Sequence, residues 1–175
     1  MPYDQRGAMS RVYGFPPHAR ADAQILILGS MPGKASLRER KYYAHPRNAF
    51  WPIICTILDA PMERSYEERV SSLLEHRIAL WDVLKTCVRG SSLDSDIDEA
   101  SIVPNDFEAF FARHPAIRRV CFNGAKAEAA FMRYVKPALP AVPAELAYFR
   151  LPSTSPANAS FSFDQKLNAW RAVFR

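Results

Sequence analysis

Residues 24–29 read QILILG, an apolar run that leads directly into the turn SMPGKAS of residues 30–36. Three more apolar, β-branched or aromatic runs follow: IALWDVL at 78–84, RRVCFNG at 118–124 and AYFRL at 147–151. Runs this short and continuous are typical of strands that are buried on both faces of a sheet. The sequence therefore predicts four such strands.

Segments with the spacing of amphipathic helices lie before, between and after the later strands. The predicted helices are 50–58, 66–77, 106–113, 125–135 and 164–174. Alternation of strands and helices predicts a parallel sheet with helices on both faces. We expect an α/β protein, specifically a three-layer α/β/α sandwich with a four-stranded parallel sheet. Residues 1–175 are expected to form a single domain, with 1–20 as a loosely ordered N-terminal segment.

Composition narrows the choice of partners and compartment. The 175 residues include 23 Lys and Arg and 18 Asp and Glu, a net charge of +5, which suits a polyanionic partner but is also common in other proteins. Cys55, Cys87 and Cys121 are odd in number and widely spaced, which fits neither a disulfide framework nor a zinc or iron–sulfur site. The polar N-terminus and the lack of an apolar run of roughly 20 residues predict a cytoplasmic protein with no membrane span.

Polar and turn-forming residues gather at the carboxyl ends of the four predicted strands. These places are 30–36, Asp82 onward, Asn123 with Gly124, and 151–158. In an open parallel sheet, ligands bind outside the carboxyl ends of the strands. We therefore expect the functional site at this edge.

The turn after the first strand, GSMPGKASL at 29–37, exposes backbone N–H groups that can hold an anion. A P-loop needs four residues between its glycines and a Ser or Thr after its lysine. Here only three residues separate Gly29 from Gly33, and Ala35 follows Lys34. The sequence thus argues against a nucleoside triphosphate site, and a plain turn without function remains an alternative.

The segment KYYAHPRNAFWPI, residues 41–53, places Asn48 close to the start of a helix whose first turn contains Pro52. Asn is also a frequent helix N-cap, so a purely structural role for Asn48 stays open. Tyr43 is equally compatible with a place in the core.

Four segments together resemble the uracil-DNA glycosylase superfamily. GSMPG (29–33), SL (36–37) and YYAHPRNAFW (42–51) look like motif one of its mismatch-specific branch, and most like the hypoxanthine-DNA glycosylase (deoxyinosine glycosylase) family. LPSTSPANAS (151–160) resembles the second motif, the loop that enters the minor groove, while ALWDVL (79–84) and CFNGAKAE (121–128) match the middle strands. The resemblance runs from residue 23 to 160.

This resemblance implies an enzyme of base excision repair that flips a deaminated base out of damaged DNA and hydrolyses its N-glycosidic bond. The chemistry needs a water molecule and stabilisation of charge, and it implies no cofactor, metal or iron–sulfur cluster. We expect hypoxanthine, uracil or both as the target, and a monomer in solution.

The resemblance also implies roles for individual residues in base binding and catalysis. Asp82 would accept the ring N–H that hypoxanthine and uracil present and that adenine and cytosine lack, although a strand-end Asp can also simply cap a turn. Tyr43 would stack on the base, with Met31 and Asn123 also in the base pocket. Asn48 would hold the attacking water, helped by the Ser30 hydroxyl.

The chain departs from the superfamily pattern at two positions. Met31 replaces the usual Asp or Asn of motif one, and Leu151 replaces the usual His or Asn of motif two, so strong activity on uracil is doubtful and a purine such as hypoxanthine is favoured. Contacts to the DNA backbone are expected from the following residues: Lys34, Arg47, Ser153, Thr154, Ser155, Pro156 and Asn158.

Two other functions remain open on sequence grounds. One is a DNA-binding module with the same fold and weak or no catalysis, which Met31 and Leu151 favour. The other is a small α/β protein that acts on a free nucleotide or a phosphate ester, supported only by the turn at 29–36.

Overall fold

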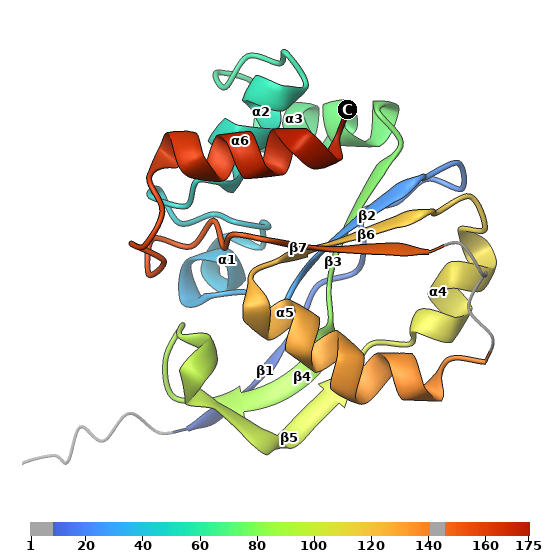
Figure 1. The fold of residues 1–175 in the computed structure, drawn as a ribbon. Helices are drawn as coiled ribbons and strands as arrows, with labels where there is room; N and C mark the ends of the chain where they lie inside the picture. Colours follow the sequence, from blue (N-terminus) through green and yellow to red (C-terminus); the bar gives the residue numbers. More distant parts are fainter. Residues whose placement is uncertain (1–8, 141–145) are drawn as a thin grey trace, which may run out of the picture.

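Four parallel strands form the central sheet of the computed structural model, which describes residues 9–140 and 146–175 (Figure 1). The strand order is β3 (Ile78–Asp82), β2 (Ile25–Gly29), β6 (Arg119–Asn123) and β7 (Ala147–Leu151). Gly29 pairs with Asp82, and Asn123 pairs with Leu151. The carboxyl ends of all four strands therefore meet at one edge. The predicted α/β fold with a four-stranded parallel sheet is confirmed.

Side chains of alternate residues in β2 enter two separate apolar cores. Ile27 packs with helices α2 (Phe50–Ile57), α3 (Tyr66–Glu75) and α6 (Phe163–Val173). Leu26 and Leu28 pack on the opposite face, with α4 (Phe107–Arg113) and α5 (Ala125–Ala130). Figure 1 shows these two groups of helices on either side of the sheet. All five predicted helices are present, and α5 continues as a π-helical turn over Phe131–Val135.

A second sheet, which the sequence did not predict, lies beside the first. It is antiparallel, with the order β1 (Ser10–Tyr13), β4 (Leu84–Arg89) and β5 (Ile97–Pro104). The run 78–84, predicted as one strand, is divided at Val83, so that Leu84 already belongs to β4. Residues 10–13 are paired strand, which corrects the expected loose order for this part of 1–20, while 1–8 lie outside the described residues.

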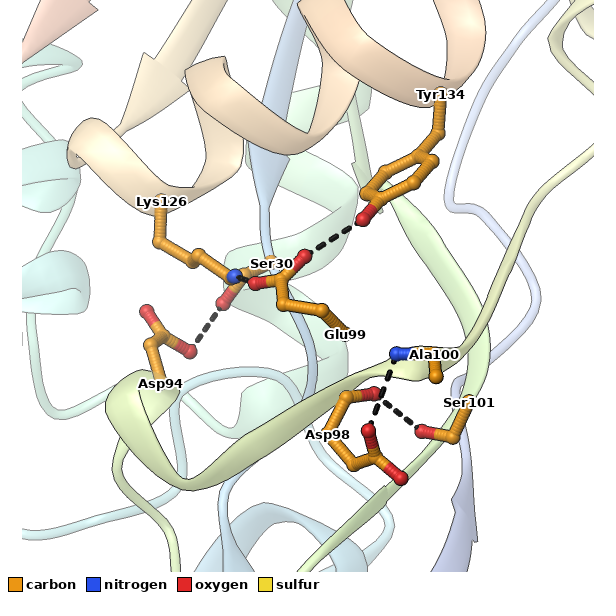
Figure 2. Close-up of polar contacts among 8 residues, drawn as sticks. All are labelled: Ser30, Asp94, Asp98, Glu99, Ala100, Ser101, Lys126 and Tyr134. Atoms are coloured by element: carbon orange, nitrogen blue, oxygen red, sulfur yellow. Dashed lines mark hydrogen bonds and ion pairs between the residues drawn. The ribbon is translucent and has the colours of Figure 1, made fainter.

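Hydrogen bonds tie the second sheet to the helical layer. Glu99 of β5 accepts hydrogen bonds from Lys126 at the start of α5 and from the Tyr134 hydroxyl, the latter at 2.6 Å (Figure 2). These two bonds connect β5 to the layer of α5. Separately, His18 in the connection between β1 and β2 bridges to Leu80 of β3 through backbone hydrogen bonds of 2.8 and 2.9 Å.

A short helix, α1 (Lys34–Glu39), begins inside the segment that was predicted as a turn. It ends at Arg40, whose φ of 54° is left-handed. Across the described ranges, no helix combines the length and the apolar character that a membrane crossing requires. The same residues contain no group of His, Cys, Asp and Glu side chains arranged to bind a metal ion.

Candidate active site

A cavity of about 570 Å³ opens at the carboxyl edge of the parallel sheet. Its wall combines the turn after β2, the segment before α2, the strand ends at Asp82 and Asn123, the β4–β5 connection and the loop after β7. Every residue that the sequence assigned to catalysis or base binding lines it: Ser30, Met31, Tyr43, Asn48, Asp82 and Asn123. The predicted backbone-binding residues Lys34, Ser153, Thr154, Ser155, Pro156 and Asn158 line it as well.

Arg47 is the predicted site residue that lies outside the cavity wall. It is exposed, and its backbone N–H donates to Nδ1 of His45 at 3.1 Å. Met31 touches the cavity but is only 7% exposed, and its side chain belongs to the apolar core on the α4 and α5 face. Neither placement tests the roles that the sequence suggested.

The inner end of the cavity is built around Gly29, where β2 and β3 run side by side. A Cβ atom at Gly29 would lie 2.5 Å from Asp82 Oδ1 and 2.8 Å from the Tyr43 hydroxyl. Only glycine leaves room for these two polar groups to approach the backbone so closely. The strand end and the tyrosine thus meet at a single point of the cavity.

Two polar atoms at this point are buried without a hydrogen-bond partner of normal geometry among the described residues. They are Asp82 Oδ2 and the Tyr43 hydroxyl oxygen. A buried polar atom without a partner costs about 1–3 kcal/mol, so such atoms are rare unless a ligand or water completes them. Burial, and secondarily the nearby Asp94, raises the pKa of Asp82 to about 7, although Arg89 opposes the shift. Burial and the charge of Asp82 also raise the pKa of Tyr43, although the nearby Asn123 side chain, which makes no hydrogen bond of normal geometry with it, opposes the shift, so the hydroxyl remains a donor.

Tyr43 is held in an unusual conformation. Its φ is 54°, a left-handed value that bulky residues rarely adopt. One face of its ring stacks on Phe50, with centroids 4.0 Å apart and an interplanar angle of 25°. The strain and the stacking together fix the direction in which the hydroxyl points.

Asn48 lies at the start of α2 and combines two roles. Its Oδ1 accepts the backbone N–H of Phe50 at 2.9 Å, two residues on, which forms an Asx turn ahead of the helix. The N-cap of α2 is Ala49 and no side chain among the described residues caps this helix, so Asn48 does not have the N-cap role that the sequence left open. The Asn48 side chain also lines the cavity. An amide oxygen has two lone pairs, so the turn leaves one acceptor position and the whole NH₂ group for a ligand.

Asn123 is engaged with the loop that follows β7. Its Oδ1 accepts the Thr154 N–H, and its Nδ2 donates to Thr154 Oγ1, both at 2.9 Å. The Thr154 carbonyl in turn accepts the N–H of Ala49 at 3.0 Å. Through these bonds Asn123 holds the loop against the start of α2, and its side chain also forms part of the cavity wall.

The loop 151–158 is rigid because its own hydroxyls and carbonyls are paired. Ser153 Oγ accepts the Ser155 N–H, and Ser155 Oγ accepts the Ala157 N–H, each at 3.2 Å. Asn158 Nδ2 donates to the Ser153 carbonyl at 3.1 Å. Since both serine oxygens act as acceptors, their hydroxyl hydrogens remain available to an outside acceptor such as a phosphate.

The β4–β5 connection supplies cavity residues that the sequence did not reveal: Ser92, Leu93, Asp94 and Ser95. Asp94 accepts a hydrogen bond from Ser30 Oγ at 2.6 Å (Figure 2), and Ser92 Oγ accepts the Lys34 N–H at 2.9 Å. Desolvation of its carboxyl group raises the pKa of Asp94. The hydrogen bond from Ser30 and the positive charges of Arg89 and Lys126 oppose this shift. The only sequence signal was a polar stretch, SSLDSD, which is typical of any surface loop.

Comparison with known proteins identifies the family of this chain. The family model described as the uracil DNA glycosylase superfamily matches residues 16–174. A Methanosarcina acetivorans protein named hypoxanthine DNA glycosylase is 37% identical over 163 residues, which cover 93% of this chain and 97% of the relative. A Methanosarcina barkeri protein of the same name is 38% identical over 114 residues, or 65% of this chain and 71% of the relative.

A solved structure extends the similarity to the fold. It is a solution NMR structure of a protein from Methanosarcina acetivorans, provisionally described as a uracil DNA glycosylase. It is 35% identical, with a TM-score of 0.75, and the match covers 95% of this chain and 98% of the other. Because the family model matches nearly the whole chain and one relative is 37% identical over 93% of it, the protein belongs to the uracil DNA glycosylase superfamily.

Proposed function

We propose that this DNA glycosylase excises hypoxanthine from DNA by hydrolysing the N-glycosidic bond of a nucleotide that has been flipped into the cavity. Two relatives that bear the name hypoxanthine DNA glycosylase support this choice. A base inside a duplex cannot reach a cavity at a strand edge, so extrusion of the nucleotide is part of the proposal.

The observation that carries the proposal is the pair of unpartnered polar atoms beside Gly29. Ionised Asp82 is an acceptor, and the Tyr43 hydroxyl is a donor. Hypoxanthine presents the complement, a ring N–H beside a carbonyl oxygen, whereas adenine presents a ring acceptor beside an amino group. The pair therefore favours the deaminated base, and uracil is a second substrate because its edge has the same pattern.

Met31 and Leu151 are apolar, whereas the superfamily usually has polar side chains at these two positions. This difference favours a purine leaving group. We infer that Asn48 holds the attacking water with the lone pair that its hydrogen bond from the Phe50 N–H leaves free. Ser153, Ser155 and Lys34 then grip the phosphates, and the segment 156–158 fills the space left by the flipped nucleotide, so that DNA contacts offset the few kcal/mol that unstacking costs. A monomer suffices for this arrangement, since every group named lies in one chain.

The test is single-turnover release of hypoxanthine from a deoxyinosine-containing oligonucleotide, followed by alkaline cleavage at the abasic site. We expect the wild-type protein to release the base and Asn48→Ala to be at least ~10-fold slower with nearly unchanged DNA affinity. Asn48→Ser is the matched control for this turn, because a serine hydroxyl can accept the same Phe50 N–H, although more weakly, but lacks the amide. It should be as slow as Asn48→Ala.

Two outcomes would contradict the proposal. Wild-type rates in Asn48→Ser together with slow Asn48→Ala would mean that Asn48 serves only the helix. Binding of deoxyinosine DNA without any base release by the wild-type protein would instead identify a DNA-binding module that has lost catalysis.

A further inference from the structure

The turn after β2 lacks the carboxylate or amide that would activate water, because Met31 occupies that place and packs into the core. A carboxylate nevertheless reaches the same part of the cavity from a different element. Asp94 comes from the β4–β5 connection, and its Oδ1 lies 2.6 Å from Ser30 Oγ (Figure 2). Both residues line the cavity.

The direction of this hydrogen bond determines what Ser30 can do. A hydroxyl has one hydrogen, and Ser30 donates it to Asp94, so toward any third group Ser30 can only accept. A water molecule in the cavity must therefore donate to Ser30 Oγ. Ser30 and Asn48 both line the cavity. A water molecule that donates one hydrogen to Ser30 Oγ and the other to Asn48 Oδ1 keeps its lone pairs free to attack a nucleotide bound in the cavity.

The charges around Asp94 favour its ionised form over that of Asp82. Arg89 of β4 is buried behind the turn, where it donates to the Pro32 carbonyl, and its Nη1 has no partner among the described residues. Lys126 at the start of α5 adds a second positive charge, which its ion pair with Glu99 partly offsets. The other titratable groups that interact with Asp94 are Asp82, Tyr43 and Cys87.

We propose that Ser30 and Asp94 form a proton relay that deprotonates the attacking water during glycosidic hydrolysis, an inference that rests on the proposed function. The water oxygen bonds to C1′ while the C1′–N bond breaks and its electron pair leaves with the base. The water proton passes to Ser30 Oγ, and the Ser30 proton passes to Asp94. The departing base takes a proton from solvent, and Asp94 later returns its proton to solvent.

The relay is tested with Asp94→Asn, Ser30→Ala and the double variant, by single-turnover release of hypoxanthine from deoxyinosine DNA. Asparagine keeps an oxygen for Ser30 but cannot take up a proton. Each single variant should lose roughly 100-fold in rate, the lower range for general acid–base catalysis, and the double variant should lose no more than the slower single one. Asp96→Asn is the matched control, since Asp96 is an exposed carboxylate of the same loop that pairs with Ser91.

The pH dependence separates a relay from a structural role. Protonated Asp94 is as inert as asparagine, so the ratio of wild-type to Asp94→Asn rates should fall toward one as the pH is lowered toward the pKa of Asp94, which burial raises above its ordinary value. Because the charge of Asp94 raises the pKa of Asp82, the same ratio is also measured in an Asp82→Asn background, where position 82 no longer titrates. A ratio that stays constant, or fully additive losses in the double variant, would overturn the relay.

Failure of the relay and failure of the proposed function give different results. Wild-type protein that releases no hypoxanthine contradicts the function itself. An active wild type with an equally active Asp94→Asn, both unfolding at the same temperature, overturns the relay and leaves the function standing.

Discussion

At the scale of single residues, the site concentrates features that destabilise the fold. Asp82 is 3% exposed, and one of its oxygens has no partner among the described residues. Tyr43 is strained in the backbone, and Gly29 must lack a side chain so that both groups fit. Strain and unpartnered polar groups that persist in a native structure mark positions where function is favoured over stability.

Asp82→Asn should therefore stabilise the protein, and more so at high pH. The pKa of Asp82 is about 7 in the folded protein, well above its value near 3.9 in an unfolded chain. Between these two values the folded state binds more protons, so wild-type stability falls as pH rises through this window. The substituted asparagine has no charge to bury, and we expect a gain of roughly 2–4 kcal/mol in the free energy of unfolding at about pH 8.

Urea denaturation of both proteins at about pH 5 and about pH 8 measures this difference. The gain should shrink toward acid pH, where the wild-type carboxyl is already neutral. Asp96→Asn, which removes an exposed carboxylate outside the cavity, should change stability little at either pH. An equal gain for Asp82→Asn at both pH values would show that burial of the charge is not its cause.

At the scale of elements, the parallel sheet was predictable because its strands are buried on both faces and read as continuous apolar runs. The predicted bounds of β2, β6 and β7 lie within one residue of those observed. The predicted strand 78–84 runs past the end of β3 into β4. Only Val83 separates the two strands, and no turn residue marks the change of sheet. β5, with the sequence IDEASIVP, is half exposed and polar, so its pattern resembles that of a loop.

The same physics decided which site residues were predictable. Ser30, Asp82 and Asn123 stand at the ends of recognisable strands, so the rule for parallel sheets placed them together before the structure did. Asp94 was not predictable, because its position depends on the antiparallel sheet and on the tie of Glu99 to α5. The reciprocal bonds of Asn123 were also hidden, since they require knowing that Thr154 folds back onto β6.

The two hydrogen bonds between Asn123 and Thr154 predict that two variants lose both stability and DNA affinity. Thr154→Val removes the Oγ1 acceptor, and Asn123→Ala removes both bonds, and each should lower the free energy of unfolding by about 1–3 kcal/mol because a buried partner is left unsatisfied. Both should weaken binding to undamaged and deoxyinosine DNA by the same factor, since these bonds hold the loop that grips phosphates. Equilibrium unfolding and fluorescence anisotropy with the two oligonucleotides measure these effects. Loss of binding confined to deoxyinosine DNA in Asn123→Ala would assign Asn123 to the base instead.

At the scale of the whole molecule, two sheets cooperate to make one cavity. Asp82 at the end of β3 and Tyr43 in the segment before α2 form the inner end, and the connection between β4 and β5 of the antiparallel sheet supplies a side wall with Asp94. Asp82 is buried at the inner end of the cavity and Asp94 lies on its more exposed wall, while the chain as a whole carries a net charge of +5. This separation suits a ligand that is polyanionic outside and presents a hydrogen-bond donor to the interior, which describes a flipped nucleotide in DNA.

This charge distribution predicts a salt-dependent affinity that particular basic residues control. Each Lys or Arg that contacts a phosphate releases counterions, so its loss should reduce the slope of log affinity against log salt by about 1. We expect this reduction for Lys34→Ala, because Lys34 lines the cavity. We expect it also for Arg47→Ala, because Arg47 is exposed and precedes the cavity residue Asn48 in the sequence. Arg113→Ala is the control, because Arg113 ends α4, the helix that leads toward the opposite edge of the sheet at β6. Anisotropy titrations over a series of salt concentrations measure the three slopes, and a change for Arg113→Ala equal to that for Lys34→Ala would mean that the DNA backbone does not follow the cavity rim.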